Sequence, residues 1–163
     1  MRSLILFLTL ATFAIQGSAQ KFGHIDSQAL LLSMPERDAA QKKLEEQAVM
    51  YEEQLKSMQS EFQTKYDEYL AKGQTWPEAI RKTKEKELGQ LQQGIQDFGQ
   101  TAQEDLASLE EELLTPMFDR ARKAIEDVGA ENGFTYIFDS STGVTLFNGG
   151  EDVTPLVRTK LGL

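Results

Sequence analysis

The chain has 163 residues, a length that fits one domain, and 26 acidic against 17 basic side chains give it a net charge of −9. Nucleic-acid binding requires clustered lysine and arginine, so this acidic balance argues against a nucleic-acid partner. There is no cysteine and His24 is the sole histidine, which excludes a structural zinc site and a cysteine–histidine nucleophile pair. No phosphate-binding loop or dinucleotide fingerprint occurs either. We therefore expect no enzymatic activity, no cofactor and no metal.

Residues 1–19 have the three-part pattern of a secretory signal peptide. Arg2 gives a positive start, an apolar run extends from Leu4 to Ile15, and small residues occupy positions 17–19. The apolar run is too short to span a membrane, so we expect export and cleavage after Ala19. An uncleaved membrane anchor is the alternative.

The next residues predict one strand and one short helix. Residues 21–26 alternate apolar and polar side chains, which is typical of a strand. Ser27 can cap a brief helical turn that continues through Leu32, and Pro35 interrupts that turn.

A long helical hairpin is predicted from residue 36 to residue 113. Residues 36–71 contain neither glycine nor proline, and the sequence Lys72-Gly73-Gln74 ends this first helix. Thr75 to Glu78 have the form of a capping box, and the return helix runs from Pro77 to Leu113. Two helices of nearly equal length with a short connection run antiparallel, here with the tip at residues 72–77.

Apolar residues on both predicted helices recur in steps of three and four, which defines a heptad seam. On the first helix Lys65 takes the place of one apolar residue. The seam residues of that helix are Leu44, Ala48, Tyr51, Leu55, Met58, Phe62 and Tyr69.

Residues 20–35 and 114–163 are predicted to form a small α/β body. Pro116 disturbs the helical hydrogen bonds, and a helix from Met117 to Glu131 follows and ends at Gly133. Strands are predicted at 134–139 and 144–147 around a turn at 140–143, and Asp152 or Thr154 caps a last helix at 155–161. The fold class is α+β, predominantly α. Three short strands leave open edges and a small core, which favours oligomerisation.

Aromatic and methionine side chains are concentrated on the predicted hairpin and are candidates for contact with other proteins. Such side chains adapt to varied apolar surfaces. The alternative is that a seam at heptad spacing is only the core of the hairpin, although Tyr66 lies off the seam and is expected to be exposed. The candidates are Tyr51, Met58, Phe62, Tyr66, Tyr69, Trp76 and Phe98.

Charge and glycine are distributed unevenly along the hairpin. Residues 65–86 include six basic and four acidic side chains, whereas residues 87–119 include eight acidic side chains and no basic one. The tip is either a surface for weak contact with anionic membranes or a solvated helical face. Glycines in the return helix are either hinge positions or sites of close helix packing. The basic tip residues are Arg81, Lys82, Lys84 and Lys86, and the glycines are Gly89, Gly94 and Gly99.

With this layout, the sequence resembles the Skp/OmpH family of periplasmic chaperones over nearly all residues after the signal peptide. The N-terminal part of the resemblance is Asp26-Ser27-Gln28 after a strand, followed by a proline and the long hairpin. The C-terminal part is more specific and consists of Leu114-Thr115-Pro116, Ala124-Ile125, the run from Gly133 to Asp139, and Asp152-Val153-Thr154 before Val157 and Leu161.

The resemblance implies a homotrimer whose bodies form a shared β-barrel and whose helical hairpins surround a cavity. It also implies an ATP-independent holdase in the periplasm, with unfolded outer-membrane β-barrel proteins as its partners. Members of the family are often basic and this chain is acidic, so no lipopolysaccharide-binding residues are transferred to it. The alternative function is a structural or scaffolding coiled-coil protein of the cell envelope.

Overall fold

The structure is a computed structural model that describes residues 20–163, so the predicted signal peptide lies outside the described residues. The chain divides into two compact units. We call residues 20–27 and 124–162 the body unit and residues 28–123, together with Leu163, the arm unit. No helix among residues 20–163 is long and apolar enough to cross a membrane.

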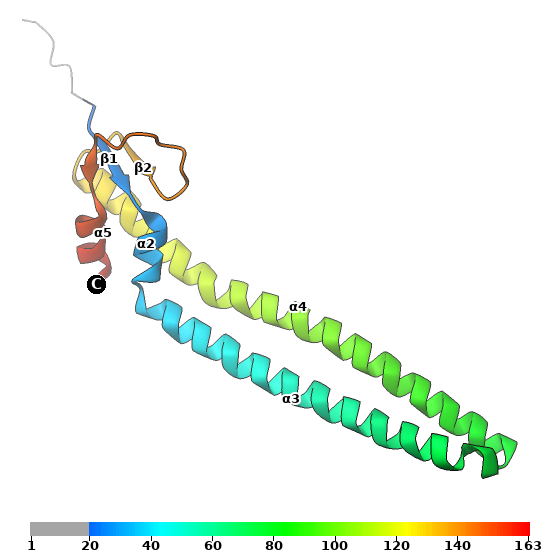
Figure 1. The fold of residues 1–163 in the computed structure, drawn as a ribbon. Helices are drawn as coiled ribbons and strands as arrows, with labels where there is room; N and C mark the ends of the chain where they lie inside the picture. The colour runs from blue at the N-terminus through cyan, green and yellow to red at the C-terminus, as the bar shows by residue number, and fades with distance from the viewer. Residues whose placement is uncertain (1–19) are drawn as a thin grey trace, which may run out of the picture. The chain divides into compact units, whose positions relative to one another are not determined.

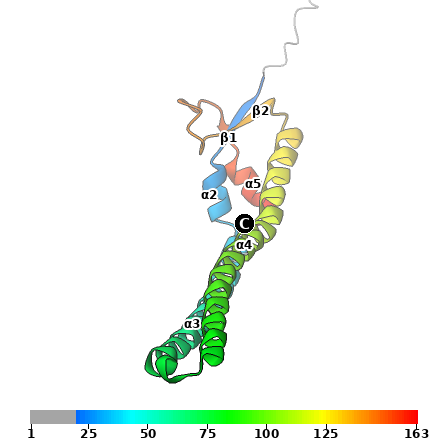
Figure 2. The same ribbon diagram turned by 90° about the vertical axis from the view of Figure 1, so that its right-hand side faces the viewer.

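The arm unit contains two long helices that run antiparallel, as the sequence predicts (Figures 1 and 2). Helix α2 (Ser27–Leu32) precedes them, helix α3 extends over Pro35–Lys72, and helix α4 extends over Glu78–Glu131 with its last turns in the body unit. Helix α3 has 38 residues without an internal glycine, and Pro35 occupies its first turn, where a missing N–H costs little.

The predicted heptad seam is the less exposed stripe of both arm helices. Every predicted seam position of α3 from Leu44 to Tyr69 is half-buried, including Lys65, whereas nearly all other positions of this stretch are exposed. The seam of α4 from Leu88 to Leu113 is also half-buried, and only Ala102 within it is fully buried. A helix pair has a single interface, so one side of each seam side chain stays open to solvent.

The connection at the tip differs from the predicted capping box. Residues Gly73–Thr75 form a short 3-10 helix, η1, and the Thr75 hydroxyl donates to the carbonyl of Lys72 at 2.7 Å. The hydroxyl therefore closes the preceding turn instead of capping α4. The first bond of α4 is instead the Arg81 N–H donating to the Pro77 carbonyl at 3.0 Å.

Helix α4 continues through Pro116. The proline lacks the N–H that would bond one turn back, but the helix extends for several turns on both sides and maintains the backbone conformation. The predicted helix from Met117 to Glu131 is thus the last part of α4. Gly133 follows with a φ of 68°, which is the left-handed conformation expected after a helix end.

The body unit contains a three-stranded sheet in the order β2-β1-β3 (Figure 1). Strand β1 (Phe22–Ile25) lies in the centre, and β2 (Tyr136–Asp139) and β3 (Glu151–Asp152) both pair with it in parallel. Gly23 is opposite Ile137 on one side and Glu151 on the other. The first two strands lie where the sequence predicts them.

The predicted strand at 144–147 and the hairpin that would place it are wrong. Residues 140–150 form a loop between β2 and β3, and Leu146 and Phe147 are 100% and 87% exposed. Strand β1 already has a neighbour on each side, so no free edge within the body unit is available beside it. Because both pairings are parallel, the chain must cross over between β2 and β3, and a tight turn cannot make that connection.

The core of the body unit is formed by small and β-branched side chains. Strand β1 contributes Ile25, the end of α4 contributes Val128, and helix α5 (Thr154–Leu161) contributes Val157, each at most 3% exposed. Val153, and not Asp152 or Thr154, occupies the N-cap position of α5, and it makes no side-chain cap bond, so the predicted cap is wrong. The Asp152 carboxylate, one residue earlier, accepts a hydrogen bond from the Thr154 N–H at 2.9 Å.

Candidate functional site

The six aromatic candidate contact residues of the arm unit form three pairs on or beside the seam. Tyr51 of α3 meets Phe98 of α4 edge to face with ring centroids 5.9 Å apart, and the Tyr51 hydroxyl donates to Asp105 at 3.1 Å. Desolvation, reinforced by this bond to a carboxylate, raises the pKa of Tyr51. Both rings are half-buried and connect the two helices.

Two further aromatic pairs lie nearer the tip. Phe62 and Tyr66 stack with centroids 5.9 Å apart, and Tyr66 is 41% exposed, as expected for a residue off the seam. Tyr69 packs against Trp76 at 6.2 Å. The Tyr69 hydroxyl donates to Glu85 across the hairpin at 2.6 Å, and this bond raises the pKa of Tyr69. Seam aromatics therefore stabilise the hairpin while leaving part of each ring in solvent.

Lys65 replaces an apolar seam residue because it has a partner on the other helix. Its ammonium group lies 2.6 Å from Glu87, which also contacts Lys84 at 3.1 Å. Hydrogen bonds from Lys65 and then Lys84 lower the pKa of Glu87, and the bond to Glu87 raises the pKa of Lys65. A polar pair at one seam position favours a single register of the two helices.

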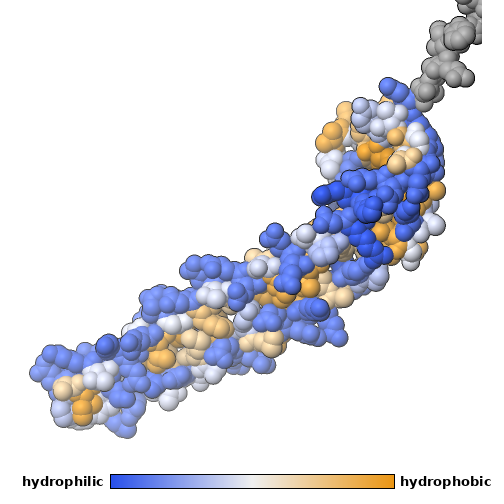
Figure 3. Space-filling model, turned by 180° about the vertical axis from the view of Figure 1, so that it is seen from behind, coloured by the Kyte–Doolittle hydropathy of each residue, from blue (hydrophilic) through white to orange (hydrophobic). Residues whose placement is uncertain are grey.

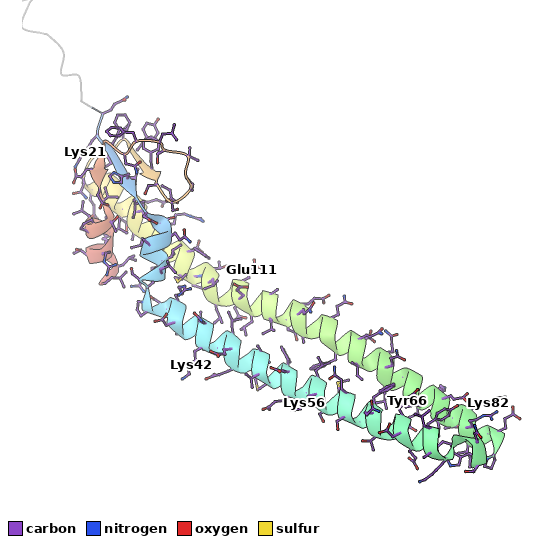
Figure 4. The ribbon with its side chains drawn as sticks, in the orientation of Figure 1. Lys21, Lys42, Lys56, Tyr66, Lys82 and Glu111 are labelled. Carbon is purple, nitrogen blue, oxygen red and sulfur yellow. The ribbon has the colours of Figure 1, made fainter. Side chains whose placement is uncertain are left out.

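The basic tip residues are mostly paired with acids of the same helix. Arg81 lies 3.8 Å from Glu85, Lys82 lies 2.8 Å from Glu78, and Lys84 contacts Glu87. Lys86 forms no ion pair with the residues that the structure describes. Figure 4 shows Lys82 at the end of the hairpin, far from Lys42 and Glu111. Exposed pairs of this kind contribute little to stability and partly neutralise the tip.

Two of the three candidate hinge glycines have free space beside them. A Cβ atom added at Gly89 or Gly99 would meet nothing within 4 Å, and at Gly94 it would lie 3.7 Å from the Met58 methyl group. Close approach of α3 therefore does not require glycine at Gly89 or Gly99. Whether the three positions act as a hinge stays a prediction.

The described residues of the arm present a half-buried apolar stripe to solvent. Among residues 20–163 no group of three or more histidine, cysteine, aspartate or glutamate side chains is placed to hold a metal ion. The apolar stripe and the seam pairs of the arm are thus the features that require a functional explanation.

Comparison with known proteins assigns this architecture to a family. The family model described as outer membrane protein (OmpH-like) matches residues 21–161. The chain belongs to the OmpH-like family. The resemblance noted in the sequence is thereby confirmed.

Named relatives of this OmpH-like chain are chaperones. It is 23% identical over 125 residues to the chaperone protein Skp of Vibrio cholerae, covering 77% of this chain and 74% of that protein. It is 22% identical over 149 residues to Skp of Pectobacterium atrosepticum, covering 91% and 90% of the two chains. Family membership supports a chaperone role rather than an enzymatic one.

A solved structure shares the fold. A chain from Caulobacter crescentus, described as an OmpH-like outer membrane chaperone, aligns with a TM-score of 0.75 over 91% of this chain and 89% of its own, at 18% identity. The predicted fold class, a helical hairpin on a small α/β body, is confirmed.

The structure of the OmpH-like chain also shows apolar surface that the heptad pattern missed. Leu70 and Ile80 near the tip and Met50 in the middle of α3 are 62%, 47% and 55% exposed and lie off the predicted seam. Large apolar side chains outside the seam positions of a helix are the sequence signal that could have identified these three residues. Figure 3 shows apolar patches along one face of the arm, bordered by hydrophilic residues.

In the body unit, three aromatic rings stack on one exposed sheet face. Phe22, Tyr136 and Phe138 all contact one another, with centroid separations of 6.0–6.2 Å among the three rings. Tyr136 and Phe138 are 58% and 44% exposed. Side chains alternate between the two faces of a strand, so the sequence alone could have placed Tyr136 and Phe138 on one face. The parallel register then sets Phe22 opposite Tyr136.

Proposed function

We propose that this OmpH-like chain is an ATP-independent holdase of the periplasm that binds unfolded outer-membrane β-barrel proteins and prevents their aggregation. The observation that carries the proposal is the half-buried apolar stripe of the arm, on a chain whose named relatives are chaperones. The segment 1–19, with its signal-peptide pattern, supports export into that compartment.

The physical demands of a holdase agree with such an arm. Unfolded chains differ in sequence, so a binding surface must accept many apolar segments weakly and release them without fuel. Two helices with one interface leave the faces of Tyr51, Phe62 and Tyr66 partly open, and each open face offers only a small apolar contact. Many weak contacts exchange faster than one tight site.

We further propose that the chain acts as a homotrimer formed through the body unit. Supporting features are the exposed stack of Phe22, Tyr136 and Phe138 and the exposed loop residues Leu146 and Phe147. The outer edge of strand β2 has no partner within the sheet, and unpaired edges favour pairing with another copy. Three copies would place three arms around a shared cavity.

The test is suppression of aggregation. An unfolded outer-membrane β-barrel protein is diluted from urea, and light scattering is followed with and without the chaperone at about one trimer per client. We expect scattering to be abolished at that ratio. A scaffold protein without chaperone activity would leave scattering unchanged, and that result would contradict the proposal.

A variant links the activity to the arm surface. Replacing Tyr66, Leu70 and Ile80 with serine removes exposed apolar side chains at positions off the heptad seam, and circular dichroism checks that losing the Tyr66–Phe62 stack leaves the hairpin folded. We expect the amount of protein needed for half suppression to rise about threefold, since several weak contacts are lost. The control replaces three exposed glutamines of the arm, Gln54, Gln59 and Gln92, with serine and is expected to behave like the unmodified protein.

A further inference from the structure

An apolar groove lies between the two arm helices, well away from the tip. Its volume is about 630 Å³, and all its lining residues belong to the arm unit. Four lining side chains are apolar and two glutamates border the groove, one from each helix. The apolar residues are Leu44, Ala48, Leu106 and Ala107, and the glutamates are Glu45 and Glu110.

Among the described residues, the two groove glutamates lack the basic partners that glutamates have at the tip. Near the tip Glu78, Glu85 and Glu87 each have a lysine or arginine within 4 Å. Glu45 and Glu110 form no ion pair with the residues that the structure describes, and both are exposed. Lys42 does not line the groove and is directed to Glu46 at 3.9 Å.

On α4 the surrounding sequence adds negative charge instead of compensating it, whereas on α3 Lys42 and Lys43 directly precede Leu44 and Glu45. Residues 87–119 of α4 contain eight acidic and no basic side chains, and Glu111 and Glu112 directly follow Glu110. An apolar floor with uncompensated carboxylates on both sides is complementary to a segment that combines apolar and cationic side chains. Acidic segments would meet like charge at both rims.

We propose that this groove binds client segments in which lysine or arginine alternates with apolar residues. The proposal rests on the holdase function proposed above and deepens it, because it names the segments that the arm selects. Apolar side chains enter between Leu44 and Leu106, and cationic groups reach Glu45 and Glu110. Attraction of exposed charges acts over about 10 Å at 0.1 M salt, so selection weakens as salt rises.

The probes are two fluorescein-labelled peptides of four repeats, one of Phe-Lys-Gly-Ser and one of Phe-Glu-Gly-Ser. Binding to the full chain beginning at Gln20 is measured by fluorescence anisotropy at low and high salt. We expect the lysine peptide to bind about tenfold more tightly than the glutamate peptide at low salt, with the difference reduced at high salt. Equal binding of the two peptides would overturn the proposal.

Matched variants locate the site. E45Q/E110Q removes the two rim charges, whereas E53Q/E112Q removes two exposed charges that do not line the groove and form no ion pair within residues 20–163. We expect the first variant to weaken binding of the lysine peptide about fivefold and the second to weaken it less than twofold. Equal weakening would show that only net charge matters and would overturn the groove as a site.

The occupant is identified with a photo-crosslinking residue, benzoylphenylalanine, at position 107. An adduct with the lysine peptide supports the proposal. An adduct with a second copy of this chain, persisting when the lysine peptide is in excess, would mean that the groove is a subunit interface and would overturn it. Circular dichroism of each variant confirms that the arm is folded.

Failure of this proposal is distinguishable from failure of the holdase function. The same preparations are tested for suppression of β-barrel aggregation. If aggregation is suppressed but the peptides bind equally, the groove proposal fails and the holdase function stands. If the lysine peptide binds through Glu45 and Glu110 but aggregation is not suppressed, the groove is a binding site and the holdase function fails.

Discussion

Asp139 connects the end of one strand to the start of a helix. Its carboxylate accepts hydrogen bonds from the Ser27 hydroxyl at 2.5 Å, the Ser27 N–H at 3.3 Å, and the Ser141 N–H and hydroxyl at 2.9 and 2.7 Å. Burial alone would raise the pKa of Asp139, but the bonds from Ser27 and Ser141 outweigh it and lower the pKa. The carboxylate thus supplies the capping acceptor for α2 from a distant part of the sequence.

We expect Asp139→Asn to destabilise the protein by about 1 kcal/mol at pH 7, because an amide replaces an ionised acceptor of several N–H and O–H groups. A lowered pKa contributes stability above the ordinary aspartate range, near pH 4, and this stability is lost as pH falls through the lowered pKa. The difference between the two proteins should therefore shrink as pH falls below the ordinary pKa of aspartate. Urea unfolding at fixed protein concentration, at pH 7 and at pH 2.5, measures this difference in the free energy of unfolding. A difference of the same size at both pH values would contradict the capping role of Asp139.

At the scale of helices, the weakest stretch of the arm is expected where the return helix contains Gly89, Gly94 and Gly99. Each glycine in a helix interior costs about 1 kcal/mol relative to alanine, and alanine fits at all three positions without a close contact. The alanine triple variant should raise the melting temperature and slow amide exchange around residues 88–100. If bending there serves function, the variant should also capture large clients less well than small ones.

Ser108→Ala on the same helix is the control for helix propensity, because it lies outside the glycine stretch. It should raise stability slightly and leave client capture unchanged. If the triple variant is stabilised yet captures every client equally well, the glycines have no hinge function. If it is destabilised, the glycines are packing contacts and the hinge proposal fails.

The arm could be predicted from sequence because its contacts repeat locally. Heptad spacing places Leu44 and Leu88 on the facing sides of the two helices, and the break at Lys72 to Gln74 fixes the tip. The partner of Lys65 could not be read from spacing, since Glu87 depends on the register of two helices. The strand predicted at 144–147 failed for a similar reason, because the pairing of β1 with β3 joins residues far apart in the sequence. The groove likewise depends on how α3 and α4 pack against each other, which spacing along one helix does not determine.

For the whole molecule, we expect the body unit to determine assembly. The double variant Tyr136→Lys/Phe138→Lys introduces charge into the stacked aromatic face. Both side chains are exposed in the single chain, so the fold of the body unit should tolerate the change. We predict a trimer for the unmodified chain and a monomer for this variant by native mass spectrometry. Tyr66→Lys in the arm is the control and should remain trimeric. A double variant that is still trimeric would place the interface elsewhere.

The parallel sheet also determines the order in which the chain can fold. Strand β1 at residues 22–25 pairs only with residues 136–139 and 151–152, whereas the arm helices contact each other across a short connection. Local contacts form faster than distant ones because less loop entropy is lost. A chain that emerges with its N-terminus first can complete its helical hairpin while β1 still lacks both neighbours. The sheet closes only after β3 has emerged, so the proposed assembly of subunits through the body unit has to wait until nearly the whole chain has been synthesised.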